Sequence, residues 1–314
     1  MSDPRIAVLA GGLSFEREVS LRSGSRMSEA LGDAGWNVGL LDLDDKLVDR
    51  LASEPPDAVL LALHGKAGED GTVQAVLEML DVPYSGPDPS ASALVWDKGL
   101  CKGVVSRGGV LTPPWLTITT DAIRDLGARK AFGRLERHIG KAQVVKPSQG
   151  GGSMGVTLLD DLSQLGDALR SALSYHSAAL VEQHVHGTEV AVAILAGEPL
   201  PPVEAVPKQG SYDFAARYTH GATEFFAPAR LDDEVLARCQ EAAVTAWRLT
   251  GCRDIARADL IVDEAGQPWF LEIDTCPGMT ETSLFPMAAE AAGLSFRAVC
   301  ERLVSLALER SPAS

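Results

Sequence analysis

The amino-acid sequence predicts an α/β protein that begins with a parallel sheet and continues into antiparallel sheets. Residues 5–10 read as a buried strand, and a glycine turn and a helix over about 15–34 follow it, as in an open α/β sheet. From Gln143 onward short strands separated by turns indicate antiparallel pairing. With 314 residues the chain is long enough for two or three domains.

Composition restricts the classes of partner. Hydrophobic residues make up 46% and charged residues 23% of the chain, as in soluble globular proteins. The net charge of −15 argues against nucleic acid or an anionic membrane as a partner, although a local basic cluster can still bind a phosphorylated small molecule. No apolar run approaches the roughly 20 residues of a membrane span. Five scattered cysteines without a C-x-x-C pair, and no signal peptide, indicate a reducing, cytoplasmic setting.

Polar residues follow the strands of the N-terminal region, which we expect to end near residue 90. Ser14 is a plausible N-cap for the helix over 15–34, and capping is one interpretation of the charges at its start. The other is that Glu16 faces the ligand crevice at the carboxyl end of the first strand. Further strands are predicted at 36–41, 58–63 and 82–86. His64 opens a loop, 64–71, that holds three glycines and two acids and indicates a ligand-facing segment.

A glycine-rich turn dominates the middle of the chain. A helix over 91–107 carries Lys98 and Lys102, and strands are predicted at 143–146, 155–159 and 179–182, with a helix at 161–174. The segment 146–155 starts with a lysine and contains three consecutive glycines. Consecutive glycines cost conformational entropy, so close backbone approach to a triphosphate is favoured over a merely flexible hairpin loop.

The C-terminal third is organised around a hairpin over 254–274. A strand at 188–195, a loop of lid length at 207–222 and a helix at about 231–249 precede it, and a helix at 295–310 follows it. If the connecting loop holds an even number of residues, Asp259 lies opposite Glu272 and Arg257 lies opposite Asp274. The opposite, apolar face then carries Ala256, Ala258, Leu260, Val262, Trp269, Leu271 and Ile273.

Three carboxylates on one hairpin face indicate a cation site. Like charges this close repel one another unless a cation lies among them, and oxygen ligands suit Mg²⁺ or Mn²⁺. A solvated sheet face is the alternative. The small-residue loop 275–280 follows directly, and its backbone N–H groups are able to bind an anion. The hairpin therefore predicts chemistry on a phosphorylated species.

These segments together resemble one family. The sequence H-G-K-A-G-E-D-G at 64–71, E-R-E-V-S-L at 16–21, and the R-A-D, L-E-I-D and P-G-M-T runs at 257–259, 271–274 and 277–280 are similar to the signature motifs of D-alanine–D-alanine ligases. The resemblance covers nearly the whole chain in the right order. It implies an ATP-grasp enzyme with an N-terminal α/β substrate domain over 1–90, a central ATP-grasp subdomain over 91–186 and a C-terminal subdomain over 187–314 that carries the metal site and lid, with ATP sandwiched between the two subdomains.

The resemblance also implies roles, position by position. ATP phosphates would be held by Lys98, Lys146 and Arg217, and the base and ribose by Glu182, Val185 and Glu189. Two Mg²⁺ or Mn²⁺ ions would be bound by Asp259, Glu272 and Asp274. The first D-alanine would be bound by Glu16 and His64, the oxyanion by Arg257 and the Gly278 amide, and the second carboxylate by Arg257, Ser283 and the Leu284 amide. Lid closure would join Glu16, Ser153 and Tyr218.

Two departures from the family pattern leave the substrate open. Gly152 stands where a serine is usual, and Asp274 stands where an asparagine is usual. A sibling ligase for another amino or hydroxy acid, and a catalytically impaired nucleotide-binding relative, are therefore the alternatives to a peptidoglycan enzyme. A nicotinamide dehydrogenase is disfavoured because G-x-G-x-x-G is absent. A homodimer is implied by the resemblance alone.

Overall fold

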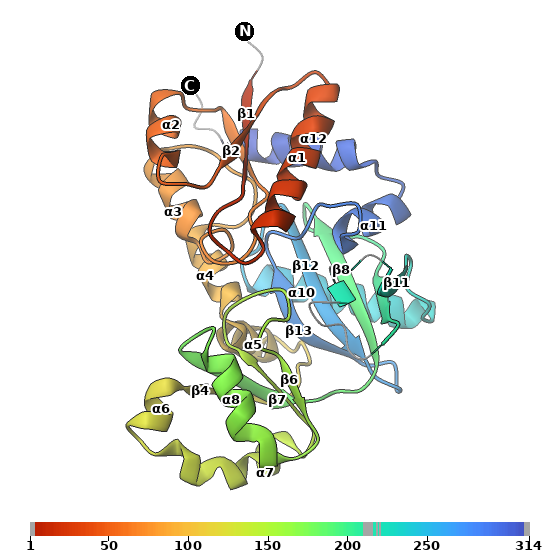
Figure 1. Ribbon diagram of the computed structural model, residues 1–314. Coiled ribbons are helices and arrows are strands. Elements are labelled where there is room, and N and C mark those ends of the chain that lie inside the picture. Colours follow the sequence, from red (N-terminus) through yellow and green to blue (C-terminus); the bar gives the residue numbers. More distant parts are fainter. Residues whose placement is uncertain (1–3, 210–215, 218, 220, 311–314) are drawn as a thin grey trace.

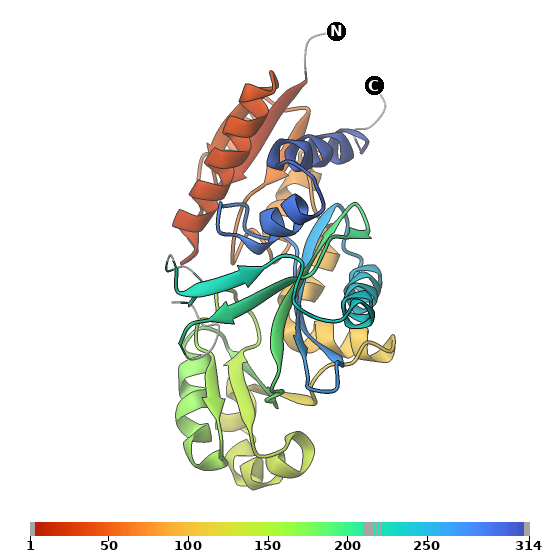
Figure 2. The same ribbon diagram turned by 90° about the vertical axis from the view of Figure 1, so that its right-hand side faces the viewer.

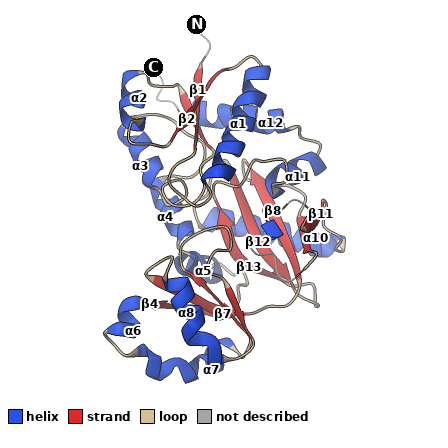
Figure 3. Ribbon diagram, viewed as in Figure 1, coloured by secondary structure: helices blue, strands red, loops and turns tan. Residues whose placement is uncertain are grey.

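The computed structural model describes residues 4–209, 216, 217, 219 and 221–310. Three sheets follow one another along an elongated molecule (Figure 1). Figure 3 shows the largest sheet in the middle, between the N-terminal elements and the four-stranded sheet. Within the described part, no helix has the length and apolar character needed to cross a membrane. The expected order of a parallel sheet followed by antiparallel sheets is confirmed.

The N-terminal sheet is parallel, with strand order β2-β1-β3. The central strand β1 is apolar and buried because helices cover both faces of a parallel sheet. The predicted strand at 82–86 forms only one bridge, between Val59 and Tyr84. The elements of this region are β1 (Arg5–Ala10), α1 (Arg17–Asp33), β2 (Asn37–Asp42), α2 (Leu47–Ser53), β3 (Ala58–Leu61) and α3 (Thr72–Met79).

The second sheet along the sequence has four antiparallel strands, in the order β4-β7-β5-β6. Helix α8 covers it with an apolar stripe at helical spacing: Leu165, Ala168, Leu169 and Ala172 are all buried. The elements are α4 (Pro89–Trp96), α5 (Lys98–Arg107), β4 (Trp115–Thr119), α6 (Thr120–Arg124), η1 (Ala128–Arg134), α7 (Leu135–Ile139), β5 (Gln143–Pro147), β6 (Thr157–Leu159), η2 (Leu162–Gln164), α8 (Leu165–Leu173) and β7 (Ala178–Gln183).

The third sheet is antiparallel, with order β11-β10-β8-β12-β13 and β9 paired to β8. Both of its faces are covered: Val190, Val192 and Ile194 of β8 pack into one core, and the alternating alanines Ala191 and Ala193 pack into another. The elements are β8 (Thr188–Leu195), β9 (Glu198–Pro199), β10 (Val203–Pro207), β11 (Thr223–Phe226), α10 (Asp233–Leu249), β12 (Ile255–Val262), β13 (Pro268–Asp274), α11 (Leu284–Ala291) and α12 (Phe296–Leu308).

Helices distant in sequence join the three sheets. Helix α12, near the C-terminus, packs on the N-terminal sheet, where Val304 shares a core with Val8 (Figure 2). Helix α5 packs instead on the third sheet, where Val105 shares a core with Ala258 and Phe270. The space between the sheets is thus held from several sides.

The single helix expected over 91–107 is two helices. Asp97 has extended backbone, with ψ of 102°, and ends α4. Its side chain accepts a hydrogen bond from the Leu100 N–H at 3.0 Å and so caps α5. An aspartate before a helical pattern is an N-cap signal, and it interrupts the longer helix here.

The hairpin has the expected pairs but not the expected loop. Asp259 lies opposite Glu272, and Arg257 lies opposite Asp274, as predicted. Five residues, 263–267, nevertheless connect the paired Val262 and Pro268, which is an odd number. A register shift between Asp259 and Leu260 compensates, so that Leu260 pairs with Phe270 and residue 271 is passed over.

This bulge corrects the predicted apolar face. Phe270 is completely buried beside Ile273, whereas Trp269 and Leu271 are not in that core. The Trp269 indole N–H donates to Asp263 Oδ2 at 2.9 Å, and Leu271 faces a pocket described below. The even-loop assumption was wrong, and a bulge preserved the charged face.

The expected lid over 207–222 connects β10 to β11, which pair antiparallel from Glu204–Phe226 to Pro207–Thr223. Tyr218, expected to close the lid, lies outside the described residues, as do 210–215 and 220.

Candidate active site

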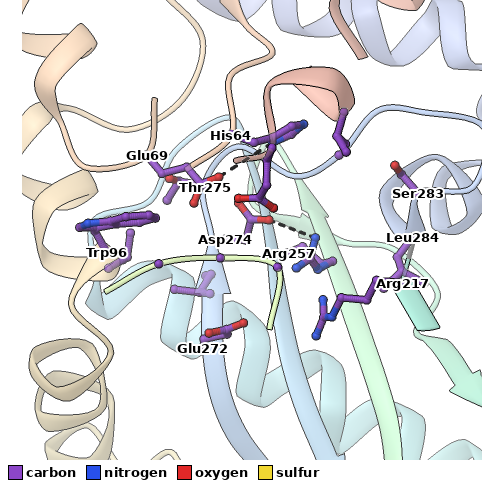
Figure 4. A pocket seen from close by; sticks show the side chains of 18 of the residues that line it. His64, Glu69, Trp96, Arg217, Arg257, Glu272, Asp274, Thr275, Ser283 and Leu284 are labelled. Carbon is purple, nitrogen blue, oxygen red and sulfur yellow. Dashed lines mark ion pairs between the residues drawn. The ribbon is translucent and has the colours of Figure 1, made fainter. Parts of the chain in front are cut away.

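Two adjoining pockets lie where the three sheets meet. The first, here called the loop pocket, is bounded by the segments after β1 and β3, the glycine-rich loop and the segment after β13 (Figure 4). The second, the sheet pocket, lies between the two antiparallel sheets. Both are lined by Lys98, Gly150, Gly151, Arg217, Glu272 and Leu284, so the pockets are continuous.

Every expected site residue at a described position lines at least one of the two pockets. The sheet pocket is lined by Lys98, Lys146, Ser153, Glu182, Val185, Glu189, Arg217, Asp259 and Glu272. The loop pocket is lined by Glu16, His64, Arg257, Asp274, Gly278, Ser283 and Leu284. Residues from distant parts of the sequence are therefore brought to one continuous cleft.

Arg257 is the centre of the charged hairpin face. Its Nε and Nη2 donate to the two oxygens of Asp259 at 2.7 and 2.9 Å, and its Nη1 lies 3.0 Å from Asp274 Oδ2. Arg217 Nη1 is 4.0 Å from Asp259 Oδ2. Figure 4 shows Arg257 between Asp274 and Arg217 at the pocket wall. A guanidinium fork of this kind fixes carboxylates geometrically as well as by charge.

Glu272 forms an ion pair with a lysine. Lys98 Nζ lies 3.2 Å from Glu272 Oε2. Burial raises the pKa of the Glu272 carboxyl, but the cations of Lys98, Lys146 and Arg217 outweigh burial and lower it to about 2. The carboxylate is therefore ionised in the folded protein and available as a ligand.

The three carboxylates do not form a ready-made metal cluster. Among the described residues, no three His, Cys, Asp or Glu side chains are grouped so that they could hold one metal ion. Arg257 separates Asp274 from Asp259, whereas Asp259 and Glu272 are direct cross-strand neighbours. This donor set fits Mg²⁺, which is usually bound through one or two carboxylates together with substrate phosphates.

The glycine-rich loop is anchored at its base. Lys98 Nζ donates to the Gly150 carbonyl at 2.5 Å, and the Lys98 N–H donates to the Ser148 carbonyl at 2.9 Å. Asp97 accepts from Ser148 Oγ at 3.1 Å. The loop itself turns through Gly152 and Ser153, whose φ angles are 61° and 57°. Glycine suits the left-handed conformation of residue 152, and a serine there would adopt it at a cost.

Glu182 and Lys146 line the sheet pocket and form a buried charge triad with Lys102, which lies behind them. Glu182 is 2% exposed, its Oε1 lies 2.5 Å from Lys146 Nζ and its Oε2 lies 2.9 Å from Lys102 Nζ. Burial raises the pKa of Glu182, but the two lysines outweigh it and lower the pKa overall. Within the described structure Oε2 has an ion pair but no donor at hydrogen-bonding angles. Glu182 lines the sheet pocket, and an ionised carboxylate accepts hydrogen bonds, so this residue suits the N–H group of a ligand.

Glu16 and His64 lie together in the loop pocket. Glu16, rather than the expected Ser14, occupies the N-cap position of α1, and its carboxylate makes no capping hydrogen bond, although Ser14 Oγ accepts from the Glu16 N–H at 3.2 Å. A methyl group added to Gly151 would lie 2.8 Å from Glu16 Oε2, so the glycine loop passes directly over this carboxylate. His64 Nε2 lies 3.3 Å from Ser23 Oγ, and its Nδ1 lies 3.9 Å from Glu69.

Burial shifts the pKa values of His64 and Glu69. It lowers the pKa of the His64 ring, against the influence of Glu16 and Asp274. Burial, followed by the charges of Asp274 and Glu16, raises the pKa of Glu69 well above its usual range. Burial therefore favours the uncharged forms of the imidazole and of the Glu69 carboxyl. Glu69 had no role assigned from the sequence, although the 64–71 motif contains it.

The segment after β13 forms an anion-binding corner. Ser283 Oγ lies 2.8 Å from Thr280 Oγ1 and accepts from the Thr280 N–H at 3.1 Å. A Cβ atom at position 278 would lie 2.7 Å from Ser283 Oγ, so any residue other than glycine would displace the Ser283 hydroxyl. Leu284 begins α11, and the first N–H groups of a helix attract negative charge. Ser23 of α1 holds this corner by accepting from the Met279 N–H at 3.1 Å.

Comparisons with known proteins agree with this geometry. Family descriptions for the D-ala D-ala ligase N-terminus and the D-ala D-ala ligase C-terminus match residues 44–87 and 104–305. A D-alanine–D-alanine ligase of Desulforamulus reducens is 42% identical over 310 residues, which cover 98% of this chain and 99% of that protein. This chain belongs to the D-alanine–D-alanine ligase family.

Solved structures of ligases share its fold. The D-alanine–D-alanine ligase of Bacillus anthracis complexed with ATP is 30% identical, with a TM-score of 0.83 and coverage of 98% of both chains. The VanG D-Ala:D-Ser ligase of Enterococcus faecalis is 28% identical, with a TM-score of 0.84 and coverage of 97% of this chain and 99% of that one. Both kinds of ligase are equally similar in fold, so the site must decide the substrate.

Proposed function

We propose that this ligase joins two D-alanines into D-alanyl-D-alanine with ATP, releasing ADP and phosphate, for peptidoglycan synthesis. The observation that carries the proposal is the continuity of the sheet pocket and the loop pocket through Lys98, Arg217 and Glu272. Phosphoryl transfer from nucleotide to amino acid needs both molecules in one cleft with the reacting oxygens in line.

ATP would occupy the sheet pocket. Its phosphates would be held by Lys98, Lys146 and Arg217. All three are cationic side chains that line this pocket together with the glycine loop. Glu182, which lines this pocket, would accept a hydrogen bond from the amino group of adenine. The backbone at Val185 would contact the base, and Glu189 would bind the ribose hydroxyls.

Mg²⁺ or Mn²⁺ would bind with the ATP phosphates. Asp259 and Glu272 would supply ligands directly, and Asp274 would join for a second ion once Arg257 turns toward substrate. When bound, the metal offsets negative charge on the transferring phosphoryl group. The residues of this chain would orient the phosphates and exclude water.

The two amino acids would occupy the loop pocket. Glu16 and His64 would bind the first D-alanine, whose carboxylate oxygen attacks the γ-phosphate and gives an acyl phosphate and ADP. The amine of the second D-alanine then attacks the acyl carbon and phosphate leaves. Arg257 and the Gly278 N–H would stabilise the oxyanion of this step. The second carboxylate would bind Arg257, Ser283 and the Leu284 N–H, and Ser153 with Tyr218 would close the lid.

The domain boundaries at 90 and 186, a homodimer and a cytoplasmic location are further parts of this proposal. The separate sheets of the three regions support the boundaries. All five cysteines are free and buried, which is compatible with a reducing setting.

The deciding experiment measures phosphate release from Mg-ATP with D-alanine, L-alanine, D-serine or D-lactate, and identifies the product by mass spectrometry. We expect release and a dipeptide with D-alanine. Release only with another acid would assign the protein to the sibling ligases. Absence of release with any of them, despite ATP binding, would favour the catalytically impaired alternative.

A further inference from the structure

Lys102 is a completely buried lysine to which no role has so far been given. It belongs to α5, is 0% exposed and is among the largest fully buried side chains. Its Nζ donates to Thr112 Oγ1 at 2.5 Å and to the Phe270 carbonyl at 3.2 Å, and lies 2.9 Å from Glu182 Oε2. It does not line either pocket, so it approaches Glu182 from behind the pocket wall.

The Lys102 ammonium is surrounded by oxygen atoms of the protein. Thr112 Oγ1 donates its own hydrogen to the Phe270 carbonyl at 2.8 Å, which leaves its lone pairs for Lys102. Two hydrogen bonds and one ion pair therefore hold the ammonium. An unpaired buried charge is costly. Burial lowers the pKa of Lys102 and the Glu182 carboxylate opposes this shift, so each group favours the charged form of the other.

Lys102 and Lys146 differ in what they can do when a nucleotide binds. Lys146 lines the sheet pocket and is a proposed phosphate ligand, so its ammonium would interact with both Glu182 and the nucleotide phosphates. Lys102 contacts three protein oxygens and the Trp115 ring, so none of its described contacts is to a group that lines a pocket except Glu182, and it keeps its position. The orientation of Glu182 in the loaded pocket then depends on Lys102.

We propose that Lys102 is a positioning residue that holds the Glu182 carboxylate ionised and aimed at the 6-amino group of the purine, and so sets the preference for ATP over a 6-oxo nucleotide. The inference rests on the proposed function, because it takes the sheet pocket as the nucleotide site. An ionised carboxylate only accepts hydrogen bonds, so it binds a 6-amino group and repels a 6-oxo group.

The test compares ATP with inosine 5′-triphosphate, which has oxygen in place of the 6-amino group. For Lys102→Met we expect the preference for ATP to fall about tenfold, through a higher KM for ATP, with kcat changed less than about threefold. Glu182→Gln should lower the same preference, and adding Lys102→Met to it should change the ratio little further, because both act on one contact.

Two outcomes would overturn the proposal. If Lys102→Met weakens the use of both nucleotides equally, the lysine only supports β13 at Phe270. If the two substitutions have additive effects on the ratio, Lys102 does not act through Glu182. Val105→Ala, a buried change on the same helix, is the matched control and should leave the ratio unchanged.

A second variant tests the proposal if Lys102→Met fails to fold, and a binding measurement tests it if the proposed function fails. Thr112→Val removes one oxygen from the ammonium and should lower the preference about threefold in the same direction; an unchanged ratio in this variant would overturn the proposal. If the unaltered protein shows no turnover with D-alanine, the proposed function fails, and the ATP-to-inosine-triphosphate ratio is measured from binding by calorimetry. An unaltered protein that binds both nucleotides equally overturns the role of Lys102.

Discussion

Asp259 lies directly opposite Glu272 in the pairing of β12 with β13, yet the two carboxylates contact different cations. Asp259 binds Arg257 through both oxygens, and Glu272 binds Lys98 at 3.2 Å. Side chains opposite each other on antiparallel strands have Cβ atoms about 5 Å apart, so a single cation can reach both carboxylates. The pair is therefore neutralised by protein cations that an incoming Mg²⁺–phosphate group has to replace.

Asp259→Asn and Glu272→Gln should each lower kcat about a hundredfold and raise the Mg²⁺ concentration that half-saturates the reaction. Each substitution keeps the side-chain shape and removes one negative ligand. The measurement is the steady-state rate as a function of Mg²⁺ at saturating ATP. Glu264→Gln, at the exposed tip of the same hairpin, is the control. An unchanged Mg²⁺ dependence in both variants would rule out these carboxylates as ligands.

Asp97→Ala should raise the KM for ATP about tenfold and lower stability by about 1 kcal/mol. Asp97 caps α5 and also accepts from Ser148 Oγ at the base of the glycine loop, so the substitution removes the cap and loosens the loop together. The measurements are ATP kinetics and urea unfolding.

Asp88→Ala separates the two effects of the Asp97 substitution. Asp88 caps α4 by accepting from the Ala91 N–H at 2.8 Å, and none of its described hydrogen bonds reaches the glycine loop. It should lose a similar amount of stability while the KM for ATP stays within about twofold. Equal KM changes in the two variants would show that the loop does not depend on Asp97.

The hairpin shows how far sequence reasoning carries and where it stops. The alternation of side chains along each strand correctly predicted which charged residues share a face, because burying Arg257 or Asp274 in the apolar core would be costly. The loop length was misjudged because a bulge at residue 271 restores the register, and a bulge leaves no signature in an apolar run. Trp269 and Leu271 were misplaced for that reason alone.

The candidate site was largely predictable because its residues lie in specific motifs, while the residues that support them were not. Lys102 was placed on a helix, but its partners Thr112, Glu182 and Phe270 lie 10, 80 and 168 positions away in sequence. Contacts of that range follow from the packing of α5 on the third sheet, which local patterns do not specify.

His64→Gln should flatten the dependence of stability on pH below neutrality. Because burial lowers the pKa of His64, the unfolded chain takes up a proton at about pH 6.5 while the folded protein does not. The free energy of unfolding therefore falls as the pH drops below about 6.5, by up to about 1.4 kcal/mol per pH unit, until the folded pKa is reached.

Urea unfolding of the parent, His64→Gln and His138→Gln between about pH 5 and 8 measures this contribution. His138 is exposed on α7, so its replacement should keep the slope of the parent. A slope in His64→Gln as steep as that of the parent would show that another group causes the acid sensitivity.

Gly151→Ala should impair the use of D-alanine more strongly than the binding of ATP, and should change stability little. Gly151 is not in the left-handed region, so alanine fits the backbone, but its methyl group would lie 2.8 Å from Glu16 Oε2 and 3.4 Å from Oε1. The end of the Glu16 side chain then has to move away from the glycine loop. We expect kcat/KM for D-alanine to fall about tenfold, with the KM for ATP changed less than about twofold. Gly133→Ala, where an added methyl group meets open space, is the control. An unchanged kcat/KM for D-alanine would mean that the position of the Glu16 carboxylate is not needed, and the contact between loop and carboxylate would then be only structural.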